Sequence, residues 1–124
     1  MLFGSRKTLL AAIKRELNRL ARKSGAPREL VAIPQDMAIE ADGITPLDKA
    51  SVAEVSAEAL LSILGAPEAL ERAHFFLAMA AILGALSGKV RTPNPAELEE
   101  LDRLLFSGPA PDRLVIANWF RALL

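Results

Sequence analysis

The chain has 124 residues, 52% of them hydrophobic, with 15 Lys and Arg balanced by 15 Asp and Glu, no cysteine and one histidine. This composition excludes an intrinsically disordered chain, a disulfide framework and a thiolate metal site, and one histidine leaves little for multi-histidine metal sites or imidazole catalysis. The length suits one domain over residues 1–124, and the lack of a signal-peptide pattern predicts a cytoplasmic protein.

The neutral total conceals a split in charge along the chain. Residues 1–28 hold eight cations and one acid, a net charge of +7, whereas residues 29–124 hold seven cations and fourteen acids, a net charge of −7. Such an asymmetry indicates either an anionic partner or compensation within the same chain.

A first helix is predicted over residues 5–24, with Ser5 or Thr8 as its N-cap and Gly25 at its end. Its apolar residues recur at helical spacing within an arc of about 100°, which suits a face turned toward the core or a partner. Most of its cations lie on the other side. The apolar stripe consists of Leu9, Leu10, Ile13, Leu17 and Leu20.

The basic residues of this helix and the turn after it are the predicted binding site for an anionic partner. Several follow one another at i, i+4 spacing, where like charges destabilise a helix by a few tenths of a kcal/mol per pair. An external anion would offset this cost, but so would the helix dipole or the acidic residues elsewhere in the chain. The predicted site residues are Lys14, Arg15, Arg19, Arg22, Lys23 and Arg28.

Three residues of this region resemble bacterial helix-turn-helix motifs: Ala21, Gly25 and Val31 have the Ala-x3-Gly-x5-Val spacing. In those motifs the small residue lets two helices pack, the glycine makes the turn and the apolar residue seats the recognition helix. The resemblance implies a DNA-binding segment over residues 14–33. Pro34 departs from the pattern because it ends the second helix after about seven residues, before it could present many side chains to a major groove.

Residues 34–47 show no helical period and are predicted to form an irregular arm, in which Asp42-Gly43 offers the turn of a short hairpin. A helical core is predicted over residues 48–124. Its first helix starts near Asp48 or at Ser51, which has capping-box spacing with Glu54, and ends at Gly65.

Residues 67–87 are predicted to form the central, buried helix, because their apolar residues point all round the axis. The uncharged run from Ala73 to Gly88 is shorter than the roughly 20 residues that span a bilayer. Ala73, Ala80 and Gly84 form a small-residue strip that would let a neighbouring helix approach closely. The lone His74 is predicted to be a core residue and not a catalytic group.

Two further helices complete the chain. One starts at Asn94-Pro95 and carries the acids Glu97, Glu99, Glu100 and Asp102, and the other starts at Asp112 and runs to Leu124. In the last helix, Trp119 and Phe120 are interface candidates, because tryptophan is enriched at binding hot spots, but the favoured interpretation places Trp119 in the bundle core.

We therefore predict an all-α bundle of about five helices with an irregular arm between the first two long ones. No catalytic, cofactor-binding or metal-binding residues are predicted, so we do not expect an enzyme. The expected function is protein–protein interaction or assembly, as a small adaptor, chaperone or structural subunit, with another protein or a second copy as partner. The alternative is a nucleic-acid-binding protein. A membrane surface is not expected, because the large residues that insert into a bilayer are scarce on the apolar side of the basic helix, where only Phe3 is aromatic.

Overall fold

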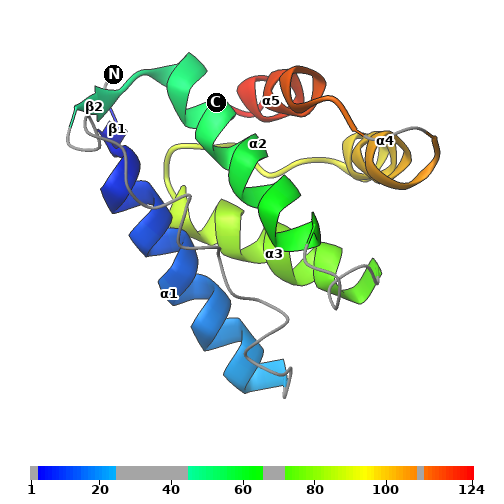
Figure 1. The fold of residues 1–124 in the computed structure, drawn as a ribbon, viewed down its shortest axis with the longest axis horizontal. Helices are drawn as coiled ribbons and strands as arrows, with labels where there is room; N and C mark the ends of the chain where they lie inside the picture. Colours follow the sequence, from blue (N-terminus) through cyan, green and yellow to red (C-terminus); the bar gives the residue numbers. More distant parts are fainter. Residues whose placement is uncertain (1–2, 25–44, 66–71, 109–110) are drawn as a thin grey trace.

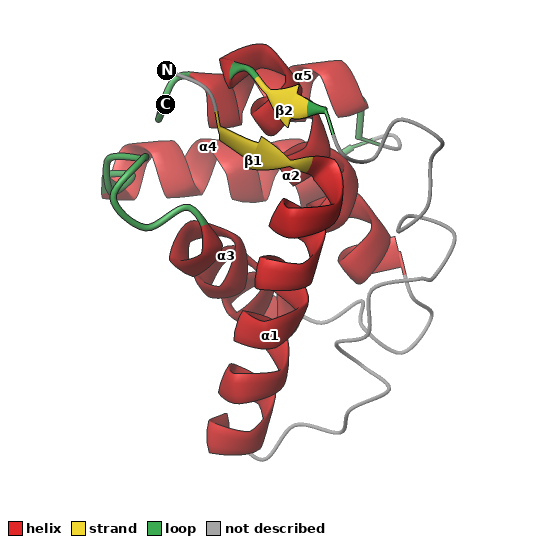
Figure 2. Ribbon diagram, turned by 90° about the vertical axis from the view of Figure 1, so that its left-hand side faces the viewer, coloured by secondary structure: helices red, strands yellow, loops and turns green. Residues whose placement is uncertain are grey.

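The computed structural model describes residues 3–24, 45–65, 72–108 and 111–124, and within these ranges the chain folds as an all-α bundle of five helices. A two-stranded antiparallel sheet joins the start of the chain to the segment before the second helix (Figure 1; Figure 2). The predicted fold class is confirmed. The elements are β1 (Phe3–Ser5), α1 (Arg6–Ser24), β2 (Pro46–Leu47), α2 (Lys49–Gly65), α3 (Arg72–Ala85), α4 (Pro95–Phe106) and α5 (Arg113–Arg121).

Side-chain caps set where the helices begin, because each satisfies a backbone N–H that has no partner inside its helix. The Ser5 hydroxyl accepts from the Thr8 N–H at 3.2 Å, and Asp112 accepts from the Leu114 N–H at 2.8 Å. Asn94 and Glu97 form a full capping box at the start of α4, with Pro95 in the first turn. These three predicted starts are confirmed.

The start of α2 corrects one of the two predicted alternatives. The Asp48 carboxylate accepts from the Ser51 N–H at 2.8 Å, so Asp48 caps the helix and Ser51 lies in its first turn. These hydrogen bonds with Ser51 lower the pKa of Asp48, because they favour its charged form. The predicted alternative, a helix start at Ser51 with a capping box to Glu54, is therefore wrong.

The short sheet differs from the predicted hairpin. Phe3 pairs with Leu47 and Ser5 with Pro46, so the end of the predicted arm pairs with the start of the chain. The Asp42-Gly43 turn and the rest of the arm up to residue 44 lie outside the described residues.

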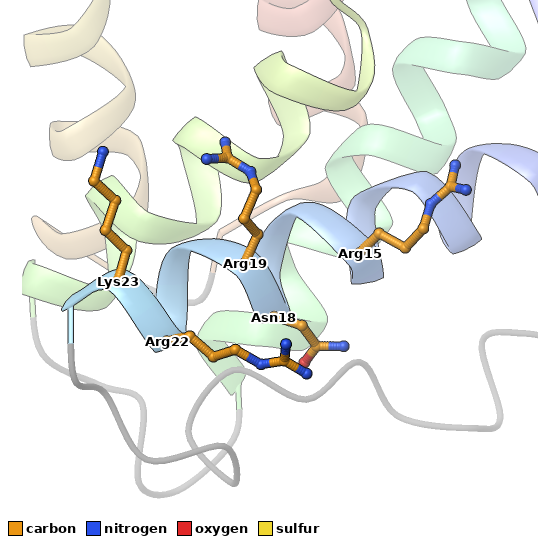
Figure 3. A pocket seen from close by; sticks show the side chains of 5 residues that line it. All are labelled: Arg15, Asn18, Arg19, Arg22 and Lys23. Carbon is orange, nitrogen blue, oxygen red and sulfur yellow. The ribbon is translucent and has the colours of Figure 1, made fainter.

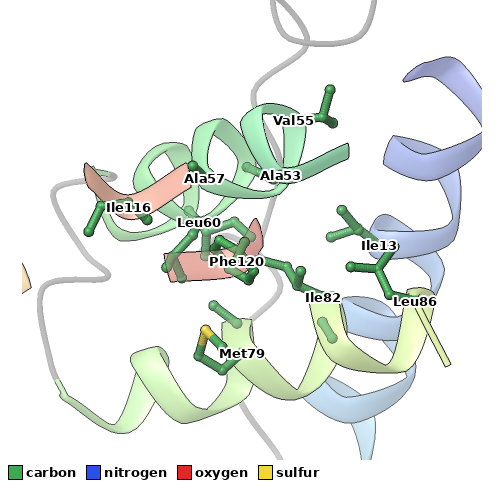
Figure 4. Packing of buried hydrophobic residues seen from close by; sticks show 14 of the residues in the cluster. Ile13, Ala53, Val55, Ala57, Leu60, Met79, Ile82, Leu86, Ile116 and Phe120 are labelled. Atoms are coloured by element: carbon green, nitrogen blue, oxygen red, sulfur yellow. The ribbon is translucent and has the colours of Figure 1, made fainter. Parts of the chain in front are cut away.

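The core forms where α1 packs on α3, and α2 packs on both α3 and α5 (Figure 4). The predicted stripe of α1 faces this core, with Leu9, Leu10, Ile13 and Leu17 buried and Leu20 half-buried. The core also contains Leu60 of α2, Ile82 of α3 and Phe120 of α5, each at most 1% exposed. Burying this apolar surface is the main force that holds the bundle together.

The helix predicted to be central and buried on every side is α3, and this prediction is wrong in part. Phe76 is 63% exposed, and Ala80 and Gly84 also face solvent. The centre is instead occupied by α2, which packs against α1, α3 and α5. The predicted start at Pro67 lies outside the described residues, as does the side chain of His74.

Gly84, a member of the predicted small-residue strip, lies beside a side chain of α1. A Cβ atom at Gly84 would lie 3.1 Å from Oε2 of Glu16 on α1, so glycine leaves room for this side chain.

No helix in the described part of the chain is long and apolar enough to cross a membrane.

The last helix lies against α2 and turns an apolar face toward it. Ile116, Trp119, Phe120 and Leu123 are buried, whereas Val115 is 41% exposed. The Leu123 carbonyl accepts from the Arg91 N–H at 3.0 Å, so the end of the described chain is docked on the bundle.

Candidate functional site

Five cations of α1 lie on the exposed side of the helix: Lys14, Arg15, Arg19, Arg22 and Lys23. We call these five residues the basic face. The same ten-residue stretch contains one acid, Glu16, so its net charge is +4. At about 1.5 Å of rise per residue, the face is about 14 Å long.

The side chains of the basic face leave α1 in two directions. Arg15, Arg19 and Lys23, which follow one another at i, i+4, i+8 spacing, extend to one side of the helix (Figure 3). Arg22 extends to the other side together with Asn18. Arg15, Asn18, Arg19, Arg22 and Lys23 line a shallow, open depression along the helix. This arrangement suits an extended anionic surface better than a small enclosed ligand.

The fold holds the basic face in place from behind. The opposite side of α1 is the buried apolar stripe, and Ile13 and Leu17 have no exposed surface. At its start, Arg6 donates two hydrogen bonds of 2.9 Å to the Glu58 carboxylate of α2, and the Arg6 side chain is 12% exposed. The backbone of α1 is therefore fixed on the bundle before any partner arrives.

The cations of the basic face have little compensation within the described part of the chain. Arg19 pairs with Glu16 of the same helix at 2.8 Å. For Lys14, Arg15, Arg22 and Lys23, no described residue supplies an ion-pair partner. All four of these side chains are exposed.

Pairing with acidic residues elsewhere in the chain is one of the alternatives to an external anion, and α4 carries the acids Glu97, Glu99, Glu100 and Asp102. α4 packs on α5, whereas α1 packs on α3 and α2, and α1 and α4 lie on opposite sides of the molecule in Figure 1. Within α4, Glu97 is bound to Arg91 by two hydrogen bonds of 2.6 Å. No ion pair joins α1 to α4 among the residues that the structure describes.

The remaining predicted site residues do not join the basic face. Trp119 is 8% exposed and Phe120 is 1% exposed, so both are packed inside this chain, and the Trp119 ring N–H donates to the Glu97 carbonyl at 2.9 Å. The favoured interpretation of Trp119 as a core residue is confirmed, and Phe120 is packed in the same core. Arg28 and the second half of the helix-turn-helix-like segment lie outside the described residues.

A groove between α3 and α4 was not predicted from the sequence. Its lining consists of Phe75, Phe76, Leu98, Glu99 and Asp102, and we call it the acidic groove. These residues come from two helices, so no local pattern could predict their meeting. Phe75 is buried and Phe76 is exposed, although both lie in the helix that was predicted to be buried on every side.

Other chemistry is sparse in the described ranges. No three His, Cys, Asp or Glu side chains gather there as a metal site would require. The chain matches no protein-family model, no curated protein and no solved structure. We therefore base its function on the surfaces of the described helices.

Proposed function

We propose that the protein is a non-enzymatic interaction module that binds an acidic protein surface through the basic face of α1. The observation that supports this most strongly is the exposure of Lys14, Arg15, Arg22 and Lys23, none of which has an ion-pair partner among the described residues. Like charges on successive turns destabilise a helix. Carboxylates from a partner would remove this repulsion and would accept hydrogen bonds from the guanidinium groups.

Several contacts must act together in such an interface. One exposed ion pair contributes about 0–1 kcal/mol, so a single lysine or arginine would not bind a partner measurably. A row of cations on a helix whose backbone is already fixed loses less conformational freedom on binding than a flexible segment would. We expect binding to weaken as salt rises, because exposed charges are screened over about 8 Å at physiological ionic strength.

A labelled poly-glutamate peptide tests the proposal directly by fluorescence anisotropy. The variant with Arg15→Gln and Arg22→Gln should bind the peptide about tenfold more weakly than the wild type, because two of the five cations are lost. The matched control is Lys49→Gln with Arg113→Gln, which removes two exposed cations at the starts of α2 and α5. This control should bind like the wild type.

Equal weakening in both variants would show that net charge, and not the basic face, governs binding, and would contradict the proposal. A wild type that does not bind the peptide at low ionic strength would contradict it as well.

A nucleic acid is the second candidate partner, supported by Arg15, Arg19 and Lys23 on successive turns of one helix side. Phosphate contacts make binding depend steeply on salt, with a slope of about −0.9 in log K against log salt for each phosphate neutralised. Gel-shift titrations with duplex DNA over a salt series distinguish the candidates. Tight, steeply salt-dependent DNA binding alongside weak poly-glutamate binding would identify DNA, and not an acidic protein, as the partner of the basic face.

A further inference from the structure

The acidic groove combines an exposed aromatic ring with carboxylates. Phe76 is 63% exposed and lies edge-on to the buried Phe75, with ring centroids 5.2 Å apart. Leu98 of α4 adds apolar surface, and Glu99 and Asp102 lie along the same helix. Glu99 and its neighbour Glu100 are exposed, and neither has an ion-pair partner among the described residues.

This combination fits the side chain of an arginine or a lysine. A cation is attracted to the face of an aromatic ring, and its aliphatic stem can cover apolar surface such as Phe76 and Leu98. The guanidinium or ammonium group can then donate a charge-assisted hydrogen bond to the Glu99 carboxylate. An uncharged apolar side chain would use the ring but would leave the carboxylate unused.

We infer that the acidic groove of one copy binds the basic face of α1 of a second copy. This inference rests on the proposed function and names the acidic surface that the basic face would bind. Its basis is charge complementarity, since the basic face carries +4 and the groove carries the exposed carboxylate Glu99 beside Glu100. Both surfaces lie in one chain whose total charge is zero.

The positions of the two surfaces decide how such copies associate. In Figure 1, α1 and α4 lie on opposite sides of the bundle, with α2 and α3 between them, so one copy cannot close the contact on itself. The contact is head-to-tail, and each added copy leaves one free basic face and one free groove. Contacts of this type build a ring if the rotation closes and an open chain if it does not.

Two variants that each destroy one surface test the inference by light scattering at low ionic strength. The first is Arg15→Gln with Arg22→Gln, which keeps its groove, and the second is Phe76→Ser with Glu99→Gln, which keeps its basic face. Phe76 and Glu99 are exposed, so the second variant is expected to fold. Circular dichroism checks this, and Glu99→Gln alone serves as a milder groove variant.

The wild type should rise above its monomer mass of 13.3 kDa as concentration increases. It should return to the monomer at about 1 M salt, where charges are screened within about 3 Å. Each double variant alone should stay monomeric. An equal mixture should form a 1:1 complex and grow no further, because it contains one intact groove contacting one intact basic face.

Three results would overturn the inference: a wild type that stays monomeric at low ionic strength, a groove variant that self-associates like the wild type, or a mixture that forms no 1:1 complex. If the wild type is monomeric but still binds poly-glutamate through the basic face, the proposed function survives and the second copy is excluded as its partner. If it does neither, both proposals fail.

Discussion

Glu97 connects the turn before α4, the start of α4 and α5. Its carboxylate accepts from Arg91 in the turn before α4 at 2.6 Å and from the Asn94 N–H at 3.0 Å. Its carbonyl accepts from the ring N–H of Trp119 on α5 at 2.9 Å. The hydrogen bonds from Arg91, followed by the one from Asn94, lower the pKa of Glu97 to about 2. The same pairing raises the pKa of Arg91.

This lowered pKa predicts how folding stability depends on pH. An ordinary glutamate has a pKa of 4.5, so the contribution of Glu97 is fully present above that pH and is lost as the pH falls toward about 2. Glu97→Gln should lower the melting temperature most above pH 4.5, and the difference from the wild type should shrink as the pH approaches 2. Thermal unfolding by circular dichroism over this range measures it. A difference that stays constant with pH would show that the charge of Glu97 does not stabilise the fold.

Gly84 lies where α3 meets α1. Glycine in a helix costs roughly 0.5–1 kcal/mol relative to alanine, because the unfolded chain has more freedom to lose. The space that Gly84 leaves is taken by the end of the Glu16 side chain, which can rotate away. The approach of the two helices at this point therefore does not depend strictly on glycine.

Gly84→Ala should accordingly leave stability unchanged or raise it by up to about 1 kcal/mol, since the helix gains and Glu16 gives way. Urea unfolding of the variant beside the wild type measures the change. A loss above about 1 kcal/mol would mean that Glu16 cannot move and that α1 and α3 require glycine here.

Local signals allowed several helix starts to be predicted from the sequence. Ser5, Asn94 and Asp112 each accept from an N–H two or three residues ahead, so the residues that make the cap are neighbours in the chain. The start of α2 had two such signals close together, at Asp48 and Ser51, and the sequence could not choose between them. The pairing of β1 with β2 joins residues about forty positions apart and left no local pattern.

The exposed side of α3 could not be predicted, because apolar residues occur all round this helix and their spacing does not identify one buried face. Whether Phe75 or Phe76 is buried depends on where the neighbouring helices lie. The sequence favoured a core position for Trp119, and the placement of α5 on the bundle confirms it. The basic face was predictable as a surface, since a row of cations opposite an apolar stripe has one sensible orientation. The acidic groove was not, because two helices share it.

The charged side chains are unevenly distributed over the described part of the molecule. The basic face belongs to α1, and α4, which carries Glu97, Glu99, Glu100 and Asp102, lies on the opposite side of the bundle in Figure 1. Electrostatic complementarity of this kind favours defined orientations between molecules more than it adds raw affinity. We therefore expect association that is weak, oriented and sensitive to salt.

The central claim is that the basic face of α1 is a contact surface, and residue-resolved NMR at rising protein concentration tests it most directly. Backbone amide shifts should change with concentration at low ionic strength for residues 14–23 and for residues 76 and 98–100. The buried positions around Leu60 and Phe120 should stay unchanged, and high salt should abolish the changes. Concentration-dependent shifts that avoid α1, or a spectrum that does not change with concentration or with added poly-glutamate, would contradict the claim.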